Sequence, residues 1–179
     1  MHRNQILGLF DQYKIRFPEE SEVIGRITNF VESYPNCFSR ELPNGHITGS
    51  AWLLDATLTK VLLTHHKKLN IWIQLGGHAD GDCDIAQVAL RESQEESGIE
   101  DISFLSSEIF DIDIHLIPER SGEPAHFHYD CRFLLRANEG AYVVGEESHD
   151  LSWIALTDLP RFTQEDSMLR MMKKSFSRS

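Results

Sequence analysis

The spacing of apolar residues changes along this chain, and that change restricts the fold more than any other feature. Up to residue 34 the apolar side chains recur every three to four positions, and from residue 47 short segments rich in Val, Ile, Leu, Thr and Trp follow. The first pattern is typical of amphipathic helices and the second of strands. Residues 84–97 return to helical spacing between two groups of predicted strands. This alternation excludes an all-helical bundle and an all-β sandwich, and it predicts an α/β sandwich.

Two helices are predicted before the first strand, over residues 2–17 and 19–34. Pro18 separates them, because its ring clashes with a helix interior and pushes the preceding residue toward an extended backbone. Pro35 ends the second helix. We expect the two helices to form a short hairpin that packs on the main body of the protein.

The predicted strands and a last helix complete the architecture. We divide the chain into an N-terminal helical extension, residues 1–42, and a main domain, residues 43–179. Strands are expected at residues 47–56, 59–66, 70–75, 111–116, 127–137, 142–144 and 151–156, and a closing helix at residues 163–174.

The charge balance limits the class of binding partner. The 179 residues include 17 Lys and Arg against 28 Asp and Glu, which gives a formal net charge of −11 at pH 7. A field of that sign repels nucleic acids and anionic lipid surfaces. No uninterrupted apolar run exceeds four residues, so no helix is expected to span a membrane. We expect a small-molecule partner, and neither a nucleic-acid polymer nor a membrane; a homodimer stays open.

The first residues and the cysteines bear on the cellular compartment. Residues 1–13 lack the continuous apolar stretch that a signal peptide carries. Cys37, Cys83 and Cys131 are odd in number, widely spaced and without a Cys-x-x-Cys motif. Reduced thiols in a cytoplasmic protein are the simplest interpretation.

A glycine-rich loop, residues 76–82, is expected to lead into the central helix. Asp84 is placed to cap the helix, with Gln87 three residues later in a capping-box pattern. Gly98 suits the left-handed position just after the helix end. These signals fix both ends of the predicted helix.

Three glutamates, Glu92, Glu95 and Glu96, lie on one arc of this helix. Like charges three or four positions apart repel by roughly a few tenths of a kcal/mol per pair. A solvated acidic face is one interpretation. The other is a cation site, because carboxylate oxygens are the ligands that Mg²⁺ prefers and the cation removes the repulsion. The glycine-rich segment directly before the helix favours the cation site.

The same residues carry a resemblance to a known family. Gly77, five residues, Cys83, seven residues and then the run from Arg91 to Ile99 resemble the Nudix box. The family pattern is Gly, five residues, Glu, seven residues, then Arg-Glu-aliphatic-x-Glu-Glu-x-Gly-aliphatic. The resemblance implies a Nudix-type α/β/α sandwich with a mixed sheet, and the helical hairpin resembles an extension of some bacterial members. Two positions depart from the pattern, Cys83 in place of the first glutamate and Ser93 in place of an aliphatic residue.

The resemblance also implies an activity, the metal-dependent hydrolysis of a diphosphate linkage in a nucleoside diphosphate derivative or similar compound, with Mg²⁺ or Mn²⁺ as the cofactor. By position in the box, Glu92 is a metal ligand and a candidate to activate water, and Arg91 orients a glutamate. Many members use a further glutamate before a Trp-containing strand, and we prefer Glu147 to Glu146 for that catalytic role, with a solvated loop as the alternative. The implied metal ligands are Glu92, Glu95, Glu96 and the carbonyl of Gly76.

Cys83 stands where the family pattern has its first glutamate, and this replacement has two interpretations. In the family, the first glutamate of the box supports the loop and the arginine, so its loss is expected to affect efficiency more than activity. Asp82 or Asp84 is a candidate to replace it in part. A nucleophilic cysteine is the alternative, but no base for it can be identified from the sequence.

Histidines form the other notable group, nine in number. His126 and His128 share one strand face, as do Asp113 and His115. A zinc site needs a further ligand that the sequence does not identify. Histidines that face solvent or contact substrate are the favoured interpretation, and we assign a contact with substrate to His128. The cationic segment around Lys67 is either a turn or a second contact with substrate phosphate.

Two rival functions remain open. An isopentenyl-diphosphate isomerase shares this fold, but it requires a catalytic cysteine in a motif of its own that this sequence lacks. A Nudix-fold module that senses a nucleotide without hydrolysis is the second alternative, which the nearly complete run from Arg91 to Glu96 disfavours.

Overall fold

A seven-stranded mixed sheet lies at the centre of the protein, with helices on both faces. The structure is a computed structural model, and it describes residues 2–67, 70–119, 122, 124–138, 140–145 and 148–177. The strands are β1 (Gly45–Leu54), β2 (Lys60–His66), β3 (Ile71–Ile73), β4 (Leu75–His78), β5 (Ile102–Ile117), β6 (His126–Ala137) and β7 (Ser148–Ala155). The helices are α1 (Asn4–Arg16), η1 (Pro18–Glu20), α2 (Ser21–Ser33), α3 (Ile85–Ser97), η2 (Leu156–Arg161) and α4 (Asp166–Phe176). This confirms the predicted α/β/α sandwich preceded by a helical hairpin.

The strand order is β3-β2-β1-β6-β5, with β4 paired to β1 and β7 paired to β2. β1 and β6 run parallel over the whole of β1, from the pair Gly45–Phe127 to the pair Leu54–Arg136. The other pairs are antiparallel. The parallel register matters for function, because it places residues near position 46 beside residues near position 128.

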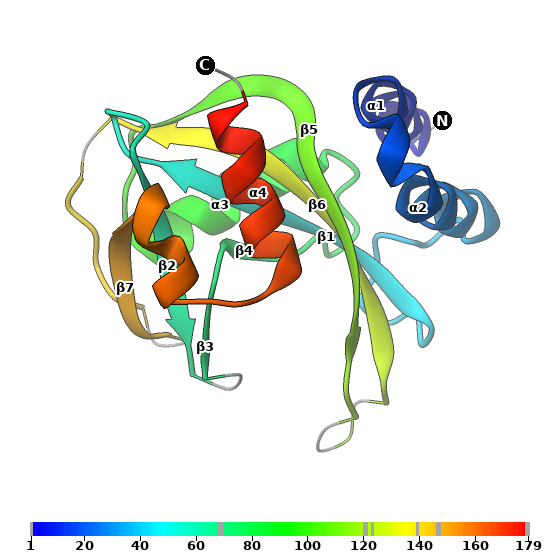
Figure 1. Ribbon diagram of the computed structural model, residues 1–179. Coiled ribbons are helices and arrows are strands. Elements are labelled where there is room, and N and C mark those ends of the chain that lie inside the picture. Colours follow the sequence, from blue (N-terminus) through cyan, green and yellow to red (C-terminus); the bar gives the residue numbers. More distant parts are fainter. Residues whose placement is uncertain are drawn as a thin grey trace.

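Alternation along the strands divides the core into two layers. Ala51 and Leu53 of β1 belong to the same buried cluster as residues of α1, α2 and α3, whereas Trp52 and Leu54 belong to a second cluster with Met168 of α4. Successive side chains of a strand point to opposite faces, so β1 contributes side chains to both layers of the core. Figure 1 shows α4 crossing one face of the sheet, with α3 behind it.

The N-terminal helices pack against the edge formed by β5 and β6 (Figure 1). Phe30 of α2 stacks on Tyr129 of β6, with ring centroids 3.8 Å apart. Tyr13 is fully buried, and its hydroxyl donates a hydrogen bond to Glu20 and accepts one from Lys174 of α4. The predicted hairpin is thus joined to both the sheet and the C-terminal helix.

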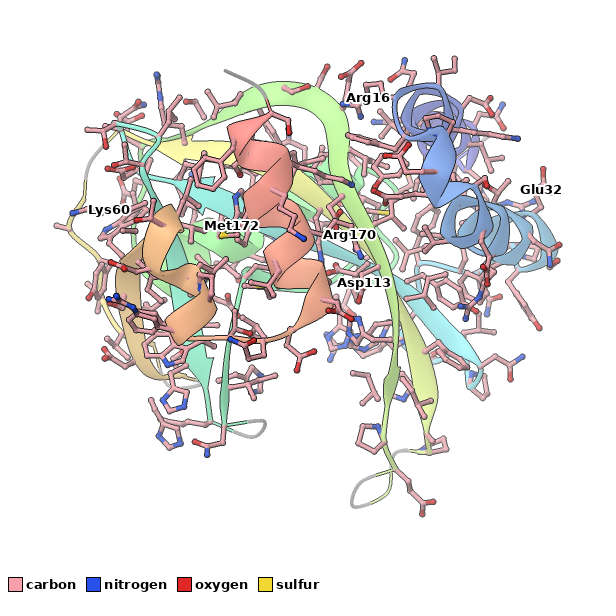
Figure 2. The ribbon with its side chains drawn as sticks, viewed as in Figure 1. Arg16, Glu32, Lys60, Asp113, Arg170 and Met172 are labelled. Atoms are coloured by element: carbon pink, nitrogen blue, oxygen red, sulfur yellow. The ribbon has the colours of Figure 1, made fainter. Side chains whose placement is uncertain are left out.

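A buried ionic network connects β5, β6 and α4. Asp111 is 0% exposed and accepts hydrogen bonds from Arg132, Arg170 and Lys174. Figure 2 shows Arg170 of α4 extending toward the strand that carries Asp113, and their side chains lie 3.5 Å apart. Buried charges are retained when partners of opposite charge surround them, as here.

Three predicted elements differ from the structure. Gly76 and Gly77 lie in strand β4, and not in a loop, because they pair with Ser50 and Gly49 of β1. The strand predicted at 111–116 is the last part of the longer β5. Residues 142–144 form no strand; the backbone N–H of Val143 instead donates to the carbonyl of Ser97 at the end of α3.

Within the described part of the chain, no helix is long and apolar enough to cross a membrane.

Candidate active site

A cavity of about 470 Å³ opens beside β4 and α3. Its lining combines glycines and carboxylates with imidazole rings from four strands, β2, β4, β5 and β6. Besides Gly76 and Gly77, the titratable residues among those that line it are Arg40, His66, His78, Asp80, Glu92, Glu96, His115, His126, His128 and Asp130.

The central helix begins and ends as the sequence predicts. The Asp84 side chain accepts a hydrogen bond from the backbone N–H of Gln87 at 3.3 Å. At the other end Gly98 has φ +69°, a left-handed conformation that favours glycine. These caps hold α3 in register against β4, so that Glu92 and Glu96 face the cavity.

The backbone of β4 positions these two glutamates. The N–H of Gly76 donates to Oε2 of Glu96 at 3.2 Å. Gly77 lies so close to Glu92 that a Cβ atom at position 77 would stand 2.2 Å from Oε2 of Glu92. Only a glycine leaves this space for the carboxylate, and the pairing of β4 with β1 fixes the glycine in place.

Arg91 lies beside the same glutamates. Its guanidinium donates to Asp82 at 3.4 Å and lies 3.9 Å from Oε1 of Glu92. Asp82 therefore contacts the arginine that the first glutamate of the box supports in the family. Cys83 itself packs against the hydrophobic core and is not among the described residues that line the cavity.

The remaining predicted residues lie in different places. Glu95 is exposed, and neither it nor Lys67 is among the described residues that line the cavity. Glu147 and Glu146 lie outside the described residues, so their roles stay predictions. His128 lines the cavity, and its contact with substrate stays a prediction.

Asp130 forms part of the cavity wall and is 1% exposed. Its carboxylate accepts hydrogen bonds from Thr48, Ser50, Gln74 and Arg132. These contacts satisfy a buried charge and connect β1, β6 and the segment before β4, so we regard Asp130 as a residue that maintains the shape of the cavity.

Histidines gather at the cavity in greater number than the sequence revealed. His46 of β1 pairs in register with His128 of β6, and the rings of His78 and His46 have centroids 5.0 Å apart. His126 and His128 share a face as predicted, with their Nε2 atoms 3.3 Å apart, and His115 accompanies Asp113 at 3.1 Å. Neither His46 nor His78 can be recognised from the sequence as a member of this group, because strand register between distant segments is not visible in it.

Burial sets the protonation state of these rings. Loss of solvent, together with the charge of His78 and other neighbours, lowers the pKa of His46 to about 4. Burial is also the main cause at His128, where the nearby rings of His46 and His115 add a smaller effect, and together they lower the pKa of His128 to about 2. Both imidazoles are therefore neutral at pH 7.

Comparisons with known proteins agree with the geometry. The family model described as NUDIX domain matches residues 46–174. An Ap4A hydrolase from C. elegans is similar in structure, with a TM-score of 0.56, 18% identity and coverage of 74% of this chain and 95% of that one. A NUDIX-family hydrolase from Clostridium perfringens has a TM-score of 0.55, 24% identity and coverage of 75% and 98%.

The dihydroneopterin triphosphate pyrophosphohydrolase from E. coli has a TM-score of 0.57 and 14% identity, over 74% of this chain and 96% of that one. No curated protein matches the sequence. The solved structures show the shared fold, and the family model spans most of the chain, including β1, α3 and α4. We conclude that this chain belongs to the Nudix hydrolase family.

Proposed function

We propose that this protein is a divalent-metal-dependent hydrolase that cleaves a diphosphate linkage in a nucleoside diphosphate derivative or a similar compound. One observation carries the proposal: Glu92 and Glu96 line a cavity, and two adjacent glycines of β4 lie against their carboxylates. This arrangement occurs within the part of the chain that matches the NUDIX domain.

The residues present fit a hard divalent cation. Two carboxylates border the same cavity, and the missing side chain at Gly77 leaves the space that the Glu92 carboxylate occupies. Mg²⁺ and Mn²⁺ favour such oxygen ligands. We propose Glu92, Glu95, Glu96 and the carbonyl of Gly76 as the ligands. When bound, the cation supplies positive charge that offsets the charge on the diphosphate oxygens.

The chain's own residues have distinct proposed roles. The Glu92 carboxylate is our candidate to accept the proton of the attacking water. Arg91, held by Asp82, keeps the Glu92 carboxylate oriented by charge. Glu147 stays our prediction for a second catalytic carboxylate, and Lys67 our prediction for a contact with substrate phosphate.

The proposed substrate class rests on the cavity and on similar proteins. A volume of about 470 Å³ suits a small molecule. Two proteins of similar fold are named for an Ap4A substrate and for a dihydroneopterin triphosphate substrate. We therefore propose a substrate in which phosphoanhydride oxygens enter the cavity near Glu92 and Glu96, with His128 in contact with it.

The test is phosphate release from a mixed panel of diphosphate compounds in the presence of Mg²⁺, with a coupled phosphatase. We expect turnover by the wild-type protein and a rate at least tenfold lower for Glu96→Gln. Glu96→Gln should fold normally, since removal of one repelling carboxylate does not weaken the helix. The matched control is Glu100→Gln, an exposed glutamate just after α3, which should keep the full rate.

Two results would contradict the proposal. Binding of nucleotides without turnover of any compound in the panel would identify a sensing module instead. A Glu96→Gln variant with the wild-type rate would remove Glu96 from the site.

A further inference from the structure

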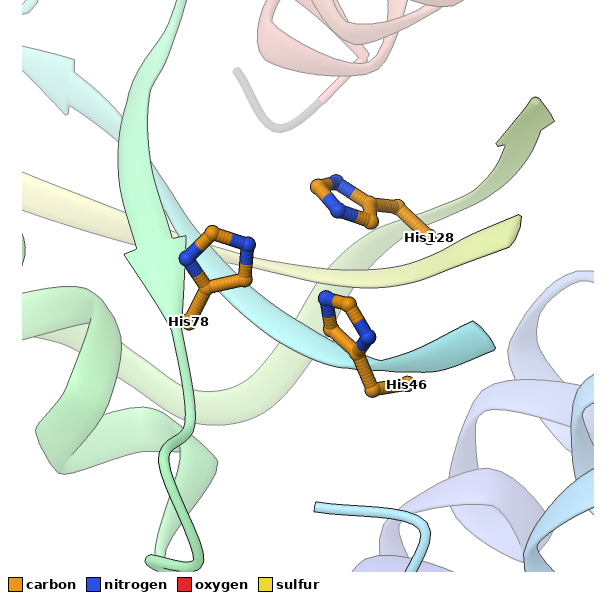
Figure 3. Close-up of side chains that lie close together, drawn as sticks. All are labelled: His46, His78 and His128. Carbon is orange, nitrogen blue, oxygen red and sulfur yellow. The ribbon is translucent and has the colours of Figure 1, made fainter. Parts of the chain in front are cut away.

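Three imidazole rings from three different strands converge at the cavity. His46 comes from β1, His78 from β4 and His128 from β6. One ligand atom of each residue lies within 4.8 Å of the corresponding atom of the other two. Figure 3 shows the three rings turned toward a common space. β1 is hydrogen-bonded to both β4 and β6, so the sheet fixes the arrangement of the three rings.

His46 is the least expected member of this group. It is 2% exposed, and neither of its ring nitrogens has a hydrogen-bond partner among the described residues. A buried polar group without a partner destabilises the folded state, so native proteins rarely retain one without a reason. The unpartnered ring faces His78 and His128 (Figure 3). A bound cation between the three rings would supply the missing partner.

Imidazole nitrogens are common ligands of metal ions in proteins. The three rings supply nitrogen ligands only. Nitrogen ligands suit Zn²⁺, Co²⁺, Ni²⁺ or Cu²⁺, whereas Mg²⁺ and Mn²⁺ favour the oxygen ligands of Glu92 and Glu96.

We propose that His46, His78 and His128 form a binding site for a transition-metal ion such as Zn²⁺, separate from the glutamate site. Three protein ligands leave a tetrahedral ion one open position. Bonds of about 2.0–2.1 Å to such an ion bring the ligand nitrogens to roughly 3.4 Å from one another, so the rings close in slightly on binding. His78 and His128 line the cavity, so an ion held by the three rings would lie at the cavity wall.

This inference does not rest on the proposed function, and the experiment keeps the two apart. The full-length protein is freed of metal with a chelator and titrated with Zn²⁺ by calorimetry, and with Co²⁺ by visible absorption. We expect one Zn²⁺ site per chain that remains in a Glu92→Gln/Glu96→Gln double variant. Co²⁺ at that site should give the intense visible absorption bands that are typical of a four-coordinate Co²⁺ ion.

The variants test each ring. His78→Ala and His128→Ala should each weaken Zn²⁺ binding roughly tenfold or more and reduce the Co²⁺ bands. His46→Phe keeps a ring of similar size in the core and removes both nitrogens, so it separates loss of a ligand from loss of folding. The control is His65→Ala on β2, where the ring stacks on Trp72, and its Zn²⁺ affinity should equal that of wild type.

Three results would overturn the inference. Zn²⁺ binding that survives unchanged in His78→Ala and His128→Ala would place the ion elsewhere. Binding that disappears in the glutamate double variant would assign it to the glutamate site. A wild-type chain that binds Zn²⁺ no better than the triple variant His46→Phe/His78→Ala/His128→Ala would leave no such site.

Discussion

Gly77 is the residue whose backbone lies against the carboxylate of Glu92. Its position in β4 puts the backbone against the Glu92 carboxylate, with space for a hydrogen atom but not for a methyl group. Gly76, next to it, has φ +155° and also faces Ser50, so a side chain there would collide with β1. The two glycines therefore have different effects: the lack of a side chain at Gly76 allows β4 to pack against Ser50 of β1, and the lack of one at Gly77 allows Glu92 its observed position.

This difference leads to a prediction for Gly77→Ala. The added methyl group meets the far end of a flexible side chain, so the protein should fold while Glu92 moves away. We expect the rate of diphosphate hydrolysis to fall tenfold or more, with little change in the free energy of unfolding. Both quantities are measurable, by phosphate release and by urea denaturation.

Gly25→Ala is the matched control, because Gly25 lies exposed on α2 and a Cβ there meets nothing within 4 Å. Alanine in a helix is favoured over glycine by about 1 kcal/mol, so this variant should be more stable with an unchanged rate. A Gly77→Ala variant with the full wild-type rate would show that the position of Glu92 is not needed.

The sequence predicts the glutamates of the site but does not reveal all of its histidines. The spacing from Gly77 to Ile99 predicted a capped helix with glutamates on one face, because helix geometry relates residues that are close in the chain. The glutamates that line the cavity are two of those three. His46 and His78 were missed, since their proximity to His128 depends on a parallel strand pair that no local pattern reveals.

Among the elements, β5, β6 and α4 are joined by charges rather than by apolar contacts alone. Arg132 is 2% exposed and lies between the carboxylates of Asp111, Asp113 and Asp130. Burial alone would raise the pKa of Asp113, but the hydrogen bond from His115 and the positive charge of Arg132 outweigh it and lower that pKa to about 2. The network therefore favours the charged form of Asp113 in the folded state.

The lowered pKa predicts how stability depends on pH. A carboxyl group whose pKa falls from about 3.9 in the unfolded chain contributes stability that is present above pH 4 and is lost as the pH falls toward 2. We expect wild type to be more stable than Asp113→Asn at pH 6. At about 1.4 kcal/mol per pKa unit, this difference should shrink by about 1 kcal/mol between pH 6 and pH 3.

Urea denaturation of both proteins at the two pH values measures this change. An unchanged difference would mean that Asp113 is not held in its charged form by the network. A difference that grows at low pH would mean that folding raises the pKa of Asp113 instead of lowering it.

The elements also show which parts of a fold can be predicted locally. Pro18 and the apolar periodicity located α1 and α2 to within a few residues. Strand β4 was missed, because two glycines and a following acidic segment are typical of a loop, and only pairing with β1 makes Gly76 and Gly77 part of the sheet. The short apolar run at 142–144 shows the opposite case: its side chains predict a strand, but the backbone N–H of Val143 donates to Ser97 at the end of α3.

Across the whole molecule, the N-terminal helices and the sheet share one hydrophobic cluster. Ile27 and Phe30 of α2 belong to the same group of buried residues as Ile47 and Phe133 of the sheet. Lys174 of α4 bonds to both Glu20 and Asp111, so the two ends of the described chain meet at one network. We propose the boundary at residues 42 and 43 as the start of the catalytic unit, with the helices before it packed onto that unit.

The charge of the whole molecule bears on how a diphosphate can be bound. A chain with a formal net charge of −11 repels a diphosphate at long range, and the cavity is lined by the carboxylates of Asp80, Glu92, Glu96 and Asp130, with Arg40 paired to Asp80. These carboxylates can serve a phosphoanhydride substrate only together with positive charge. Dependence on a divalent cation is therefore the property that our account requires most strictly.

The most direct test is hydrolysis of the diphosphate panel by wild-type protein, with the monophosphate products separated by chromatography, first with Mg²⁺, then after chelation, then with Mg²⁺ or Mn²⁺ restored. We expect turnover in the first state, no turnover in excess chelator, and recovery in the third. Full turnover in the presence of the chelator would contradict it, because the glutamates of α3 have no means of their own to neutralise the substrate.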